Sequence, residues 1–219
     1  MALFITFEGP DGSGKSTQIS LVAGYLEQQG YRVYCTREPG GTAIGDQIRQ
    51  ILHDVENTAM TARAEILLYS ASRAQLVEEV ILPRLAQGEM VLCDRYADSS
   101  YAYQGYGRQL DFETLRLITR FATQNLRPDL TIYLDLAVEE GLRRKAQANT
   151  SGQGEWNRMD RLQLEFHHRV RAGYLEMARL EPERWLVVDA AGSVEATHRL
   201  ICRRLDEVLA GISSGELLS

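Results

Sequence analysis

The chain has 219 residues, of which 44% are hydrophobic and 25% are charged. This length predicts one sizeable domain, or one domain with an inserted lid, and the composition is ordinary for a globular protein. The 24 basic and 30 acidic residues give a formal charge of −6. This charge argues against general nucleic-acid binding, because such binding is driven by clustered positive charge.

The cysteines and the N-terminus exclude several further classes of protein. Cys35, Cys93 and Cys202 are odd in number and widely spaced, so they do not indicate a disulfide framework or a zinc site. We expect Cys35 and Cys93 to be small buried hydrophobic residues, because both lie in apolar runs. No signal peptide is recognisable, and no apolar stretch approaches the roughly 20 residues that span a bilayer. We therefore expect a cytoplasmic protein without a membrane partner.

Strands and helices alternate along the predicted chain. The apolar runs at 2–7, 32–36, 90–94, 130–136 and 185–189 are predicted to be strands. The runs are continuous rather than alternating, which is typical of strands buried on both faces. The residues predicted to be helical are 15–29, 43–53, 61–81, 111–125, 138–147, 158–180 and 193–210. This order predicts an α/β fold with a mainly parallel sheet and right-handed crossovers.

Local signals define the helix ends and the loops. Gly30 is expected to cap the first helix, Pro83 to kink or end the third, and Asp111 to cap the fourth at its N-terminus. The glycines of 149–156 suggest a mobile surface loop. We expect residues 1–210 to form a single domain and residues 211–219 to form a frayed tail.

Residues 9–16, GPDGSGKS, lie between the first predicted strand and the first predicted helix. They fit the P-loop pattern G-x-x-x-x-G-K-[ST], in which backbone N–H groups and the helix N-terminus bind phosphate oxygens. Lys15 is expected to reach the β- and γ-phosphates of ATP, and the Ser16 hydroxyl to bind Mg²⁺. The chain has 22 arginines and two lysines. This position requires a compact ammonium, which the planar arginine fork cannot replace.

A second metal-binding oxygen is expected at the end of another buried strand. Asp94 ends the run 90–94 and could hold Mg²⁺ directly or through water. Asp135 ends the run 130–136 and is a rival, although no basic residue accompanies it in the sequence.

Arginines recur near the predicted strand ends, at Arg37, Arg49, Arg73 and Arg95. Arginine binds phosphate in bidentate fashion, so these side chains could frame a second anion site, although each one alone could equally be a solvated surface charge. Residues 94–108 are rich in tyrosine, serine and glutamine. They could read a base and a sugar, or they could form an amphipathic helix that packs into the core.

The chain resembles the bacterial thymidylate kinases. The resemblance is carried, in order, by GPDGSGKST, TREPGGT, AEILLYSASRAQLVE, DRYADSSYAYQGYGR, RPDLTIYLDL and GYLEMA, and it extends from about residue 2 to residue 180. It implies a three-layer P-loop fold with a five-stranded parallel sheet in the order 2-3-1-4-5, and a short helical lid at about 143–158. It also implies transfer of a phosphoryl group from ATP to dTMP for dTTP synthesis, with Mg²⁺, in a homodimer.

The resemblance also implies roles for individual residues. The expected ATP site comprises Gly9, Pro10, Asp11, Gly12, Ser13, Gly14, Lys15, Ser16 and Thr17, with Ser16 and Asp94 at the metal. The expected dTMP site comprises Glu38, Arg49, Tyr69, Arg73, Arg95, Ser100, Tyr103 and Gln104. In this reading Tyr69 stacks on thymine, Arg73 bonds a thymine carbonyl oxygen, and Tyr103 lies under the deoxyribose. Arg49 and Arg95 hold the dTMP phosphate.

The lid departs from the family pattern. Some relatives carry an arginine in the P-loop where this chain has Gly12, and the other group takes its catalytic arginine from the lid. Lids of that second group often have an R-x-R run, whereas this chain has Lys145-Ala146-Gln147-Ala148. Arg143, Arg144, Lys145 and Arg158 remain candidates. We predict that Arg144 and Arg158 are catalytic, together with Lys15, Asp11 and Arg95.

Other readings stay open from the sequence. The acceptor could be another monophosphate or a nucleoside, or the chain could be a P-loop switch that controls a partner. The absence of a guanine-reading N-K-x-D motif disfavours the switch. His167 and His168 are adjacent on a predicted helix, point about 100° apart and cannot form a paired metal site; both are expected on the surface. The family resemblance suggests that a homodimer would form through the apolar faces of helices 43–53 and 61–81.

Overall fold

The computed structural model describes residues 2–152 and 157–214. Its strands are β1 (Phe4–Glu8), β2 (Val33–Arg37), β3 (Met90–Asp94), β4 (Leu130–Asp135) and β5 (Trp185–Asp189). Its helices are α1 (Lys15–Gln28), α2 (Ala43–His53), α3 (Ala62–Leu76), α4 (Leu82–Ala86), α5 (Ala97–Ser100), α6 (Phe112–Thr123), α7 (Val138–Thr150), α8 (Leu164–Leu180) and α9 (Val194–Ser214). Three shorter helical segments are η1 (Val77–Ile81), η2 (Tyr101–Gly107) and η3 (Arg158–Arg161).

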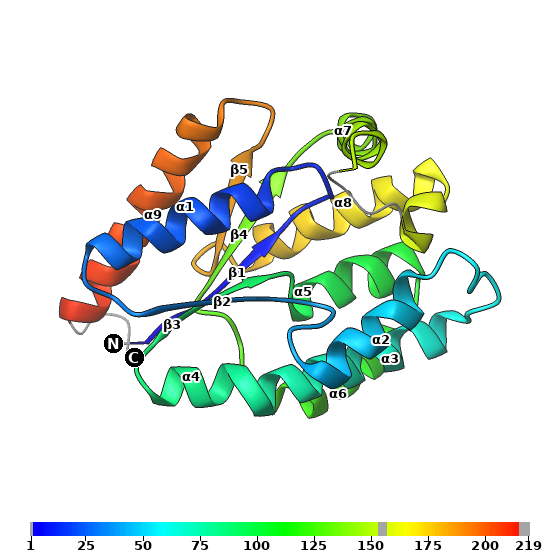
Figure 1. The fold of residues 1–219 in the computed structure, drawn as a ribbon, viewed down its shortest axis with the longest axis horizontal. Coiled ribbons are helices and arrows are strands. Elements are labelled where there is room, and N and C mark those ends of the chain that lie inside the picture. Colours follow the sequence, from blue (N-terminus) through cyan, green and yellow to red (C-terminus); the bar gives the residue numbers. More distant parts are fainter. Residues whose placement is uncertain (1, 153–156, 215–219) are drawn as a thin grey trace.

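The strands form one parallel sheet in the order β2-β3-β1-β4-β5, as predicted. Helices cover both of its faces (Figure 1), which confirms the three-layer α/β fold. In a parallel sheet the carboxyl ends of neighbouring strands meet at one edge, and ligands bind outside that edge where the strand order reverses. β1 and β3 are paired neighbours, so the segments that follow them are brought together there.

Alternate residues of β1 contact different helical layers. Ile5 and Phe7 pack in the cluster that contains α1 and α9, whereas Phe4 packs against α3, η1 and the segment after β3. Because side chains alternate along a strand, Glu8 is on the same face as Phe4. The end of β1 therefore places a carboxylate in the interior, on the side where α5 and α8 lie.

Two of the five strands are less buried than predicted. β2 and β5 lie at the edges of the sheet, and several of their residues are partly or fully exposed. The expectation that Cys35 is buried is wrong: it lies on β2 and is exposed, whereas Cys93 on the inner strand β3 is fully buried. A continuous apolar run therefore did not distinguish an edge strand from a central one.

Pro83 was expected to kink or end the helix, and the structure shows that it does not end the helical run. α3 continues through the π-helical η1 into α4, and Pro83 lies in the first turn of α4. Proline is tolerated at a first helical turn because its missing N–H would have no partner there. Asp111 caps α6 as predicted, since its side chain accepts a hydrogen bond from the Thr114 amide.

The C-terminal helix is longer than expected. α9 extends to Ser214, so residues 211–214 of the expected tail are helical, while residues 215–219 lie outside the described part of the chain. In the expected loop at 149–156, residues 149 and 150 are the last two of α7, and Ser151 and Gly152 form a turn. Residues 153–156 lie outside the described part of the chain. Within the described ranges, no helix is long and apolar enough to cross a bilayer.

Candidate active site

The P-loop, residues 9–16, wraps around the side chain of Lys15. Gly9 and Gly14 have φ angles of +138° and +90°, which side-chain-bearing residues rarely adopt. A Cβ on Gly9 would also lie 2.5 Å from the Leu134 carbonyl oxygen. The Lys15 Nζ donates to the carbonyl oxygens of Gly9 and Pro10, both at 3.1 Å. The buried ammonium is thus held inside the loop, at the N-terminus of α1.

Ser16 and Asp94, the two residues expected at the metal, lie side by side. The Ser16 hydroxyl donates to Asp94 Oδ2 at 3.5 Å. The other carboxylate oxygen, Asp94 Oδ1, is buried and has no hydrogen-bond partner within the described residues. Hydroxyl and carboxylate oxygens are the ligands that Mg²⁺ prefers, and the remaining ligands of this ion are usually waters and substrate phosphates. The two residues therefore fit a Mg²⁺ ion that accompanies a nucleotide.

Asp135 is held by a different partner. Arg171 on α8 makes a bidentate ion pair with it, at 2.7 and 2.8 Å, and the Tyr133 hydroxyl donates to it as well. No basic residue is next to Asp135 in the sequence, but the fold places Arg171 against it, so the expectation that it lacks a basic partner is wrong. Since both carboxylate oxygens are occupied, Asp94 is the better metal candidate.

Three cations converge on Asp11 of the P-loop. Arg95 Nη2 donates to it at 2.7 Å, Lys15 Nζ lies 3.5 Å from it, and Lys145 of α7 is ion-paired with it. Burial alone would raise the pKa of Asp11, but the three cations lower it well below its usual value. Lys145 also pairs with Asp160 of η3 at 2.6 Å. Both lysines of the chain are therefore at this site.

Arg73 is the centre of a buried cluster on α3. Its Nη2 lies 2.7 Å from Glu38 Oε2, its Nη1 donates to the Ser100 hydroxyl at 3.0 Å, and its side chain is 1% exposed. The Tyr96 carbonyl oxygen accepts a further bond from it. Because these partners come from different elements, the guanidinium has one fixed orientation. Arg49 of α2 is nearby in the same cleft and donates to the Pro39 carbonyl oxygen.

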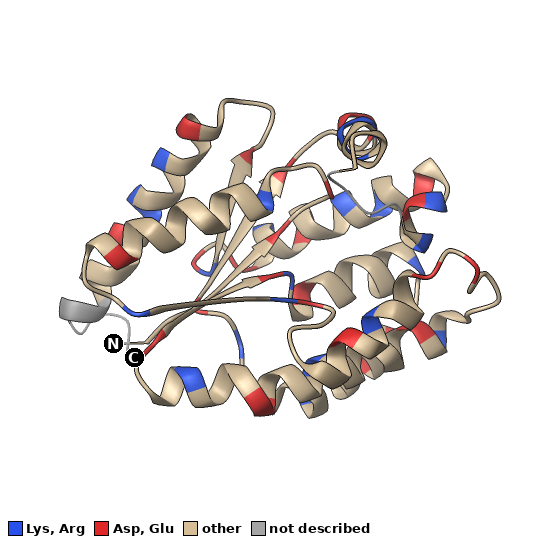
Figure 2. Cartoon of the chain, viewed as in Figure 1, with Lys and Arg blue, Asp and Glu red and all other residues tan. Residues whose placement is uncertain are grey.

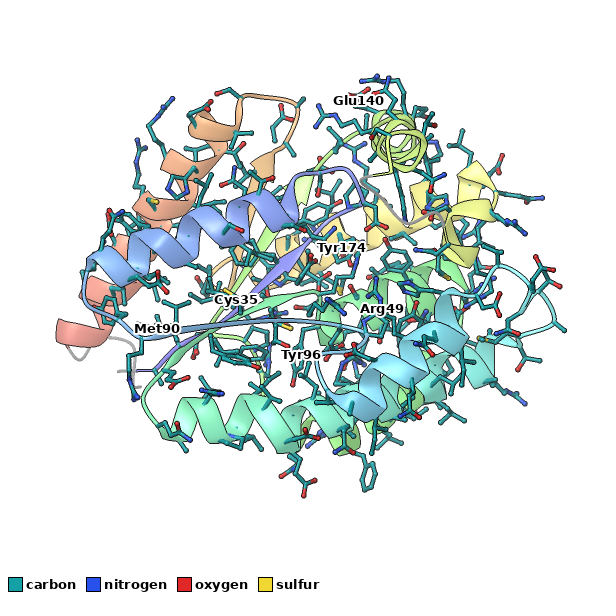
Figure 3. The ribbon with its side chains drawn as sticks, viewed as in Figure 1. Cys35, Arg49, Met90, Tyr96, Glu140 and Tyr174 are labelled. Atoms are coloured by element: carbon teal, nitrogen blue, oxygen red, sulfur yellow. The ribbon has the colours of Figure 1, made fainter. Side chains whose placement is uncertain are left out.

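One cleft, with a volume of about 770 Å³, joins these groups. Its lining includes most of the P-loop, the metal candidates and the arginines of α2, α3 and the segment after β3. Figure 3 labels Arg49 and Tyr174, which point toward the interior between α1 and α2, and Glu140, which lies on the outer side of α7. Acidic and basic residues are interspersed over the helices (Figure 2), so the positive charge of the cleft is local, as the net charge of −6 requires.

The comparisons with known proteins agree on one family. The family model of thymidylate kinase matches residues 7–201. The chain is 54% identical to the thymidylate kinase of Roseiflexus sp. (strain RS-1) over 220 residues, covering 97% of each chain. The chain belongs to the thymidylate kinase family. It is also 52% identical to the thymidylate kinase of Herpetosiphon aurantiacus, over 87% of this chain and 89% of the other.

A solved structure from the same family shares the fold. The crystal structure of thymidylate kinase from Ehrlichia chaffeensis superposes with a TM-score of 0.74 at 31% identity, covering 93% of this chain and 98% of the other. The likeness extends over nearly the whole length of both chains, so the family shares the overall fold.

Most residues expected from the family resemblance line the cleft. On the ATP side these are Pro10, Asp11, Gly12, Gly14, Lys15, Ser16 and Thr17, and on the acceptor side Glu38, Arg49, Tyr69, Arg73, Arg95, Ser100, Tyr103 and Gln104. Gly9 and Ser13 belong to the loop but do not line the cleft; Ser13 Oγ is buried without a partner among the described residues. Most of the segment 94–108 is helical, as one of the two sequence readings expected, and its Ser100, Tyr103 and Gln104 line the cleft.

The prediction for Arg158 disagrees with its surroundings in the structure. Its side chain is 8% exposed, pairs with Glu65 at 2.6 Å, donates to the Leu52 carbonyl oxygen and does not line the cleft. Glu65 also accepts bonds from Gln104 and Arg108, so Arg158 belongs to a buried network that fixes η3. Arg144 does line the cleft and donates to the Ala190 carbonyl oxygen at 3.3 Å.

Lys145 was one of the four lid candidates in the sequence, but it was not one of the two that the sequence prediction favoured. It is 7% exposed and lines the cleft, and α7 carries it to the P-loop across 134 residues of sequence. The scarcity of lysine was the available signal, because a chain that otherwise uses arginine placed its second lysine in the lid.

Close packing of α7 explains why the chain has Gly12 where some relatives have arginine. A Cβ at position 12 would lie 2.9 Å from the Arg144 Cβ and 2.9 Å from the Gly141 carbonyl oxygen. The φ angle of Gly12, +82°, is also unfavourable for other residues. The lid helix therefore occupies the space that a P-loop side chain would need.

Two further residues of the site were not expected. Glu8 is fully buried beneath the P-loop, and burial raises its pKa to about 7 although Arg95 opposes this effect. His167 was expected on the surface, but it is partly buried, lines the cleft and has a buried Nε2 without a partner in the described chain. Burial and then Lys145 lower its pKa. His168 is half exposed, as expected.

Proposed function

We propose that the chain transfers the γ-phosphoryl group of ATP to dTMP, giving dTDP and ADP, as a step in dTTP synthesis. Membership of the thymidylate kinase family supports this class of reaction. The observation that carries the proposal is a single cleft lined both by the P-loop and by Arg49, Arg73 and Arg95. Such a cleft can hold the phosphates of two nucleotides next to each other.

On the donor side, the P-loop amides, the N-terminus of α1 and the Lys15 ammonium bind the triphosphate. Burial and then Arg95 lower the pKa of Lys15, while Asp94 and Asp11 favour its charged form. Ser16 and Asp94 would hold Mg²⁺. When bound, this ion neutralises charge on the β- and γ-phosphate oxygens.

On the acceptor side, Arg49 and Arg95 hold the dTMP phosphate, and Arg73 donates to a thymine carbonyl oxygen. Tyr69 stacks on the base, and Tyr103 lies under the deoxyribose, where it leaves no room for a 2′-hydroxyl. Ser100 and Gln104 complete the base edge, and Glu38 lies near the sugar. The buried bonds of Arg73 support this role, because they orient its guanidinium before the base arrives.

The transfer itself is an in-line displacement. An oxygen of the dTMP phosphate forms a bond to the γ-phosphorus as the bond to the ADP oxygen breaks, so no covalent enzyme intermediate is needed. Lys15 and Arg95, with Arg144 and Lys145 from the lid, neutralise the oxygens of the moving phosphoryl group. Closure of the lid excludes water that would otherwise hydrolyse ATP.

A coupled ADP-release assay tests the function directly. ADP should appear rapidly with dTMP and only slowly without it, and dTMP should exceed dUMP, dCMP and thymidine as acceptors. Lys15→Ala should abolish transfer while circular dichroism shows an intact fold. Full activity of Lys15→Ala, or ADP release that does not depend on the acceptor, would refute the proposal.

We also propose that the chain is a cytoplasmic homodimer. Large apolar side chains are exposed on three helices: Ile44 and Ile51 on α2, Leu67 on α3, and Leu117 and Phe121 on α6. Phe121 is 89% exposed, which is unusual for an aromatic residue without a partner surface. Light scattering should report a dimer, and Phe121→Glu should give a folded monomer; a wild-type monomer would refute the assignment.

A further inference from the structure

Glu8 is a buried carboxylate that the proposed reaction does not use. It ends β1 directly before the P-loop and is 0% exposed. Its Oε1 accepts a bond from the Tyr96 amide at 2.9 Å. Its Oε2 accepts from the Ser99 hydroxyl at 2.7 Å and from the Tyr174 hydroxyl at 2.6 Å. A buried carboxylate with three donors from two other elements is a rigid anchor rather than a solvated charge.

These bonds hold a strained residue. Arg95 has a φ angle of +69°, a region in which residues other than glycine are uncommon. The Arg95 amide donates to the Phe7 carbonyl oxygen at 2.9 Å, and the next amide, of Tyr96, donates to Glu8. Two consecutive amides are therefore fixed to the last residues of β1. Such a conformation persists only where the surrounding structure determines it.

The same anchor reaches the side chain of Arg95. Arg95 Nη1 lies 3.5 Å from the Ser99 hydroxyl oxygen, which is bonded to Glu8 and lies 3.0 Å from the Tyr174 hydroxyl. The other end of the guanidinium is bonded to Asp11, and its Cζ is 5.3 Å from the centre of the Tyr103 ring. The guanidinium thus has one orientation in the cleft before any ligand binds.

We infer that Glu8 is a positioning residue which, through Tyr96, Ser99 and Tyr174, fixes Arg95 in the geometry that receives the phosphate of the acceptor nucleotide. This inference rests on the proposed function, in which Arg95 holds the dTMP phosphate. Glu8 is fully buried and does not line the cleft, so it should contact neither nucleotide. Its effect should therefore be confined to ligands that carry the acceptor phosphate.

Two matched tyrosine variants separate this role from a general effect on stability. The rings of Tyr133 and Tyr174 are stacked, with centroids 4.8 Å apart, but the Tyr133 hydroxyl donates to Asp135 instead of Glu8. Calorimetric titration should show that Tyr174→Phe weakens dTMP binding about five- to tenfold, the effect of one lost hydrogen bond of ordinary strength. Tyr133→Phe should change dTMP affinity less than about twofold, within the scatter of mutations that leave the contact intact.

Thymidine, which lacks the phosphate, and a non-hydrolysable ATP analogue should bind Tyr174→Phe as they bind the wild type. Glu8→Gln retains an oxygen that can accept from the Tyr96 amide, so its loss of dTMP affinity should be smaller than that of Glu8→Ala. If Glu8→Ala does not fold, the tyrosine pair still decides the question. Equal losses of dTMP and thymidine affinity in Tyr174→Phe would overturn the inference.

Arg95→Ala distinguishes failure of the inference from failure of the proposed function. This variant should lose about 100-fold in dTMP affinity, as expected for a charge-assisted bidentate contact, and Tyr174→Phe should have no further effect in its background. Unchanged dTMP affinity in Arg95→Ala would remove the proposed role of Arg95 and, with it, the basis of the inference. A loss in Arg95→Ala that adds fully to that of Tyr174→Phe would leave Arg95 as a ligand and overturn the positioning role of Glu8.

Discussion

Removal of the Lys145 ammonium tests whether the lid takes part in phosphoryl transfer. The side chain is 8% exposed and is paired with Asp11 of the P-loop and with Asp160. It is therefore already beside the P-loop residues that are proposed to bind the donor phosphates. Lys145→Ala should lower kcat much more than it changes either KM, because the contact strengthens in the transition state.

The structure separates the catalytic effect from the effect on stability. Loss of one preorganised donor from a phosphoryl-transfer site should lower kcat about 100- to 1000-fold, or roughly 3 to 4 kcal/mol. The loss of folding stability should be smaller than this catalytic effect, because both carboxylates keep other partners. Asp11 keeps Arg95 and Lys15, and Asp160 keeps the Asn157 amide. We expect the free energy of unfolding to fall by about 1 to 3 kcal/mol, which leaves the protein folded.

The assay is ADP release at saturating ATP and dTMP, with urea unfolding measured on the same samples. Arg143→Ala is the matched control, since Arg143 is on the same helix, is exposed and pairs with Glu140 rather than with the P-loop. It should retain activity within about twofold, as for other surface changes. If Lys145→Ala lost stability but kept kcat within threefold of the wild type, the ion pair would be structural and the catalytic assignment would be wrong.

Three other changes follow from the site. Gly12→Arg should lower the free energy of unfolding in urea by about 1 to 3 kcal/mol and reduce kcat, because a Cβ at position 12 would lie 2.9 Å from the Arg144 Cβ on α7. A variant with the stability and kcat of the wild type would contradict this packing. Arg73→Ala should weaken dTMP binding far more than binding of an ATP analogue in calorimetry; equal losses would argue against base reading. Burial raises the pKa of Glu8 from its ordinary value of 4.5 to about 7, so Glu8 binds its proton more tightly in the folded protein than in the unfolded chain. The stability that this proton contributes is complete below pH 4.5 and should disappear as the pH rises through 7. Glu8→Gln should therefore reduce the loss of unfolding free energy between about pH 5 and pH 8 in urea unfolding, and an unchanged loss would exclude Glu8 as its source.

Local sequence patterns were sufficient to find the strands, whereas their order in the sheet was predicted from the family resemblance. Each predicted strand overlaps its observed counterpart, because most positions that the parallel sheet buries in the runs 90–94 and 130–136 are apolar, the buried Thr131 being an exception. The P-loop was predictable for a similar reason, since its glycines and Lys15 are set by a backbone conformation within eight residues. Such features depend on neighbours in sequence.

Contacts between distant segments were not predictable in the same way. Glu65 and Arg158 are 93 residues apart, and nothing near either one shows that they pair in the interior. Arg158 was therefore predicted to be catalytic, although the structure places its guanidinium in a buried network with Glu65. Exposure of Cys35 was missed for the same reason, because its strand lies at an edge that only the assembled sheet defines.

Lys15 and Lys145, the two lysines of the chain, both contact the carboxylate of Asp11. This arrangement offers a physical reason for a lysine at position 145. Lys145 lies between Asp11 and Asp160, and a compact ammonium with three rotatable donors can bond both carboxylates and still turn toward a phosphate. A guanidinium directs its donors in one plane, so it could not exchange one of these partners for a phosphate oxygen without moving its whole side chain. The packing of α7 against Gly12 leaves little room for such a movement. Arg73 is a contrasting case, because its bonds to Glu38 and Ser100 keep its guanidinium in one fixed orientation.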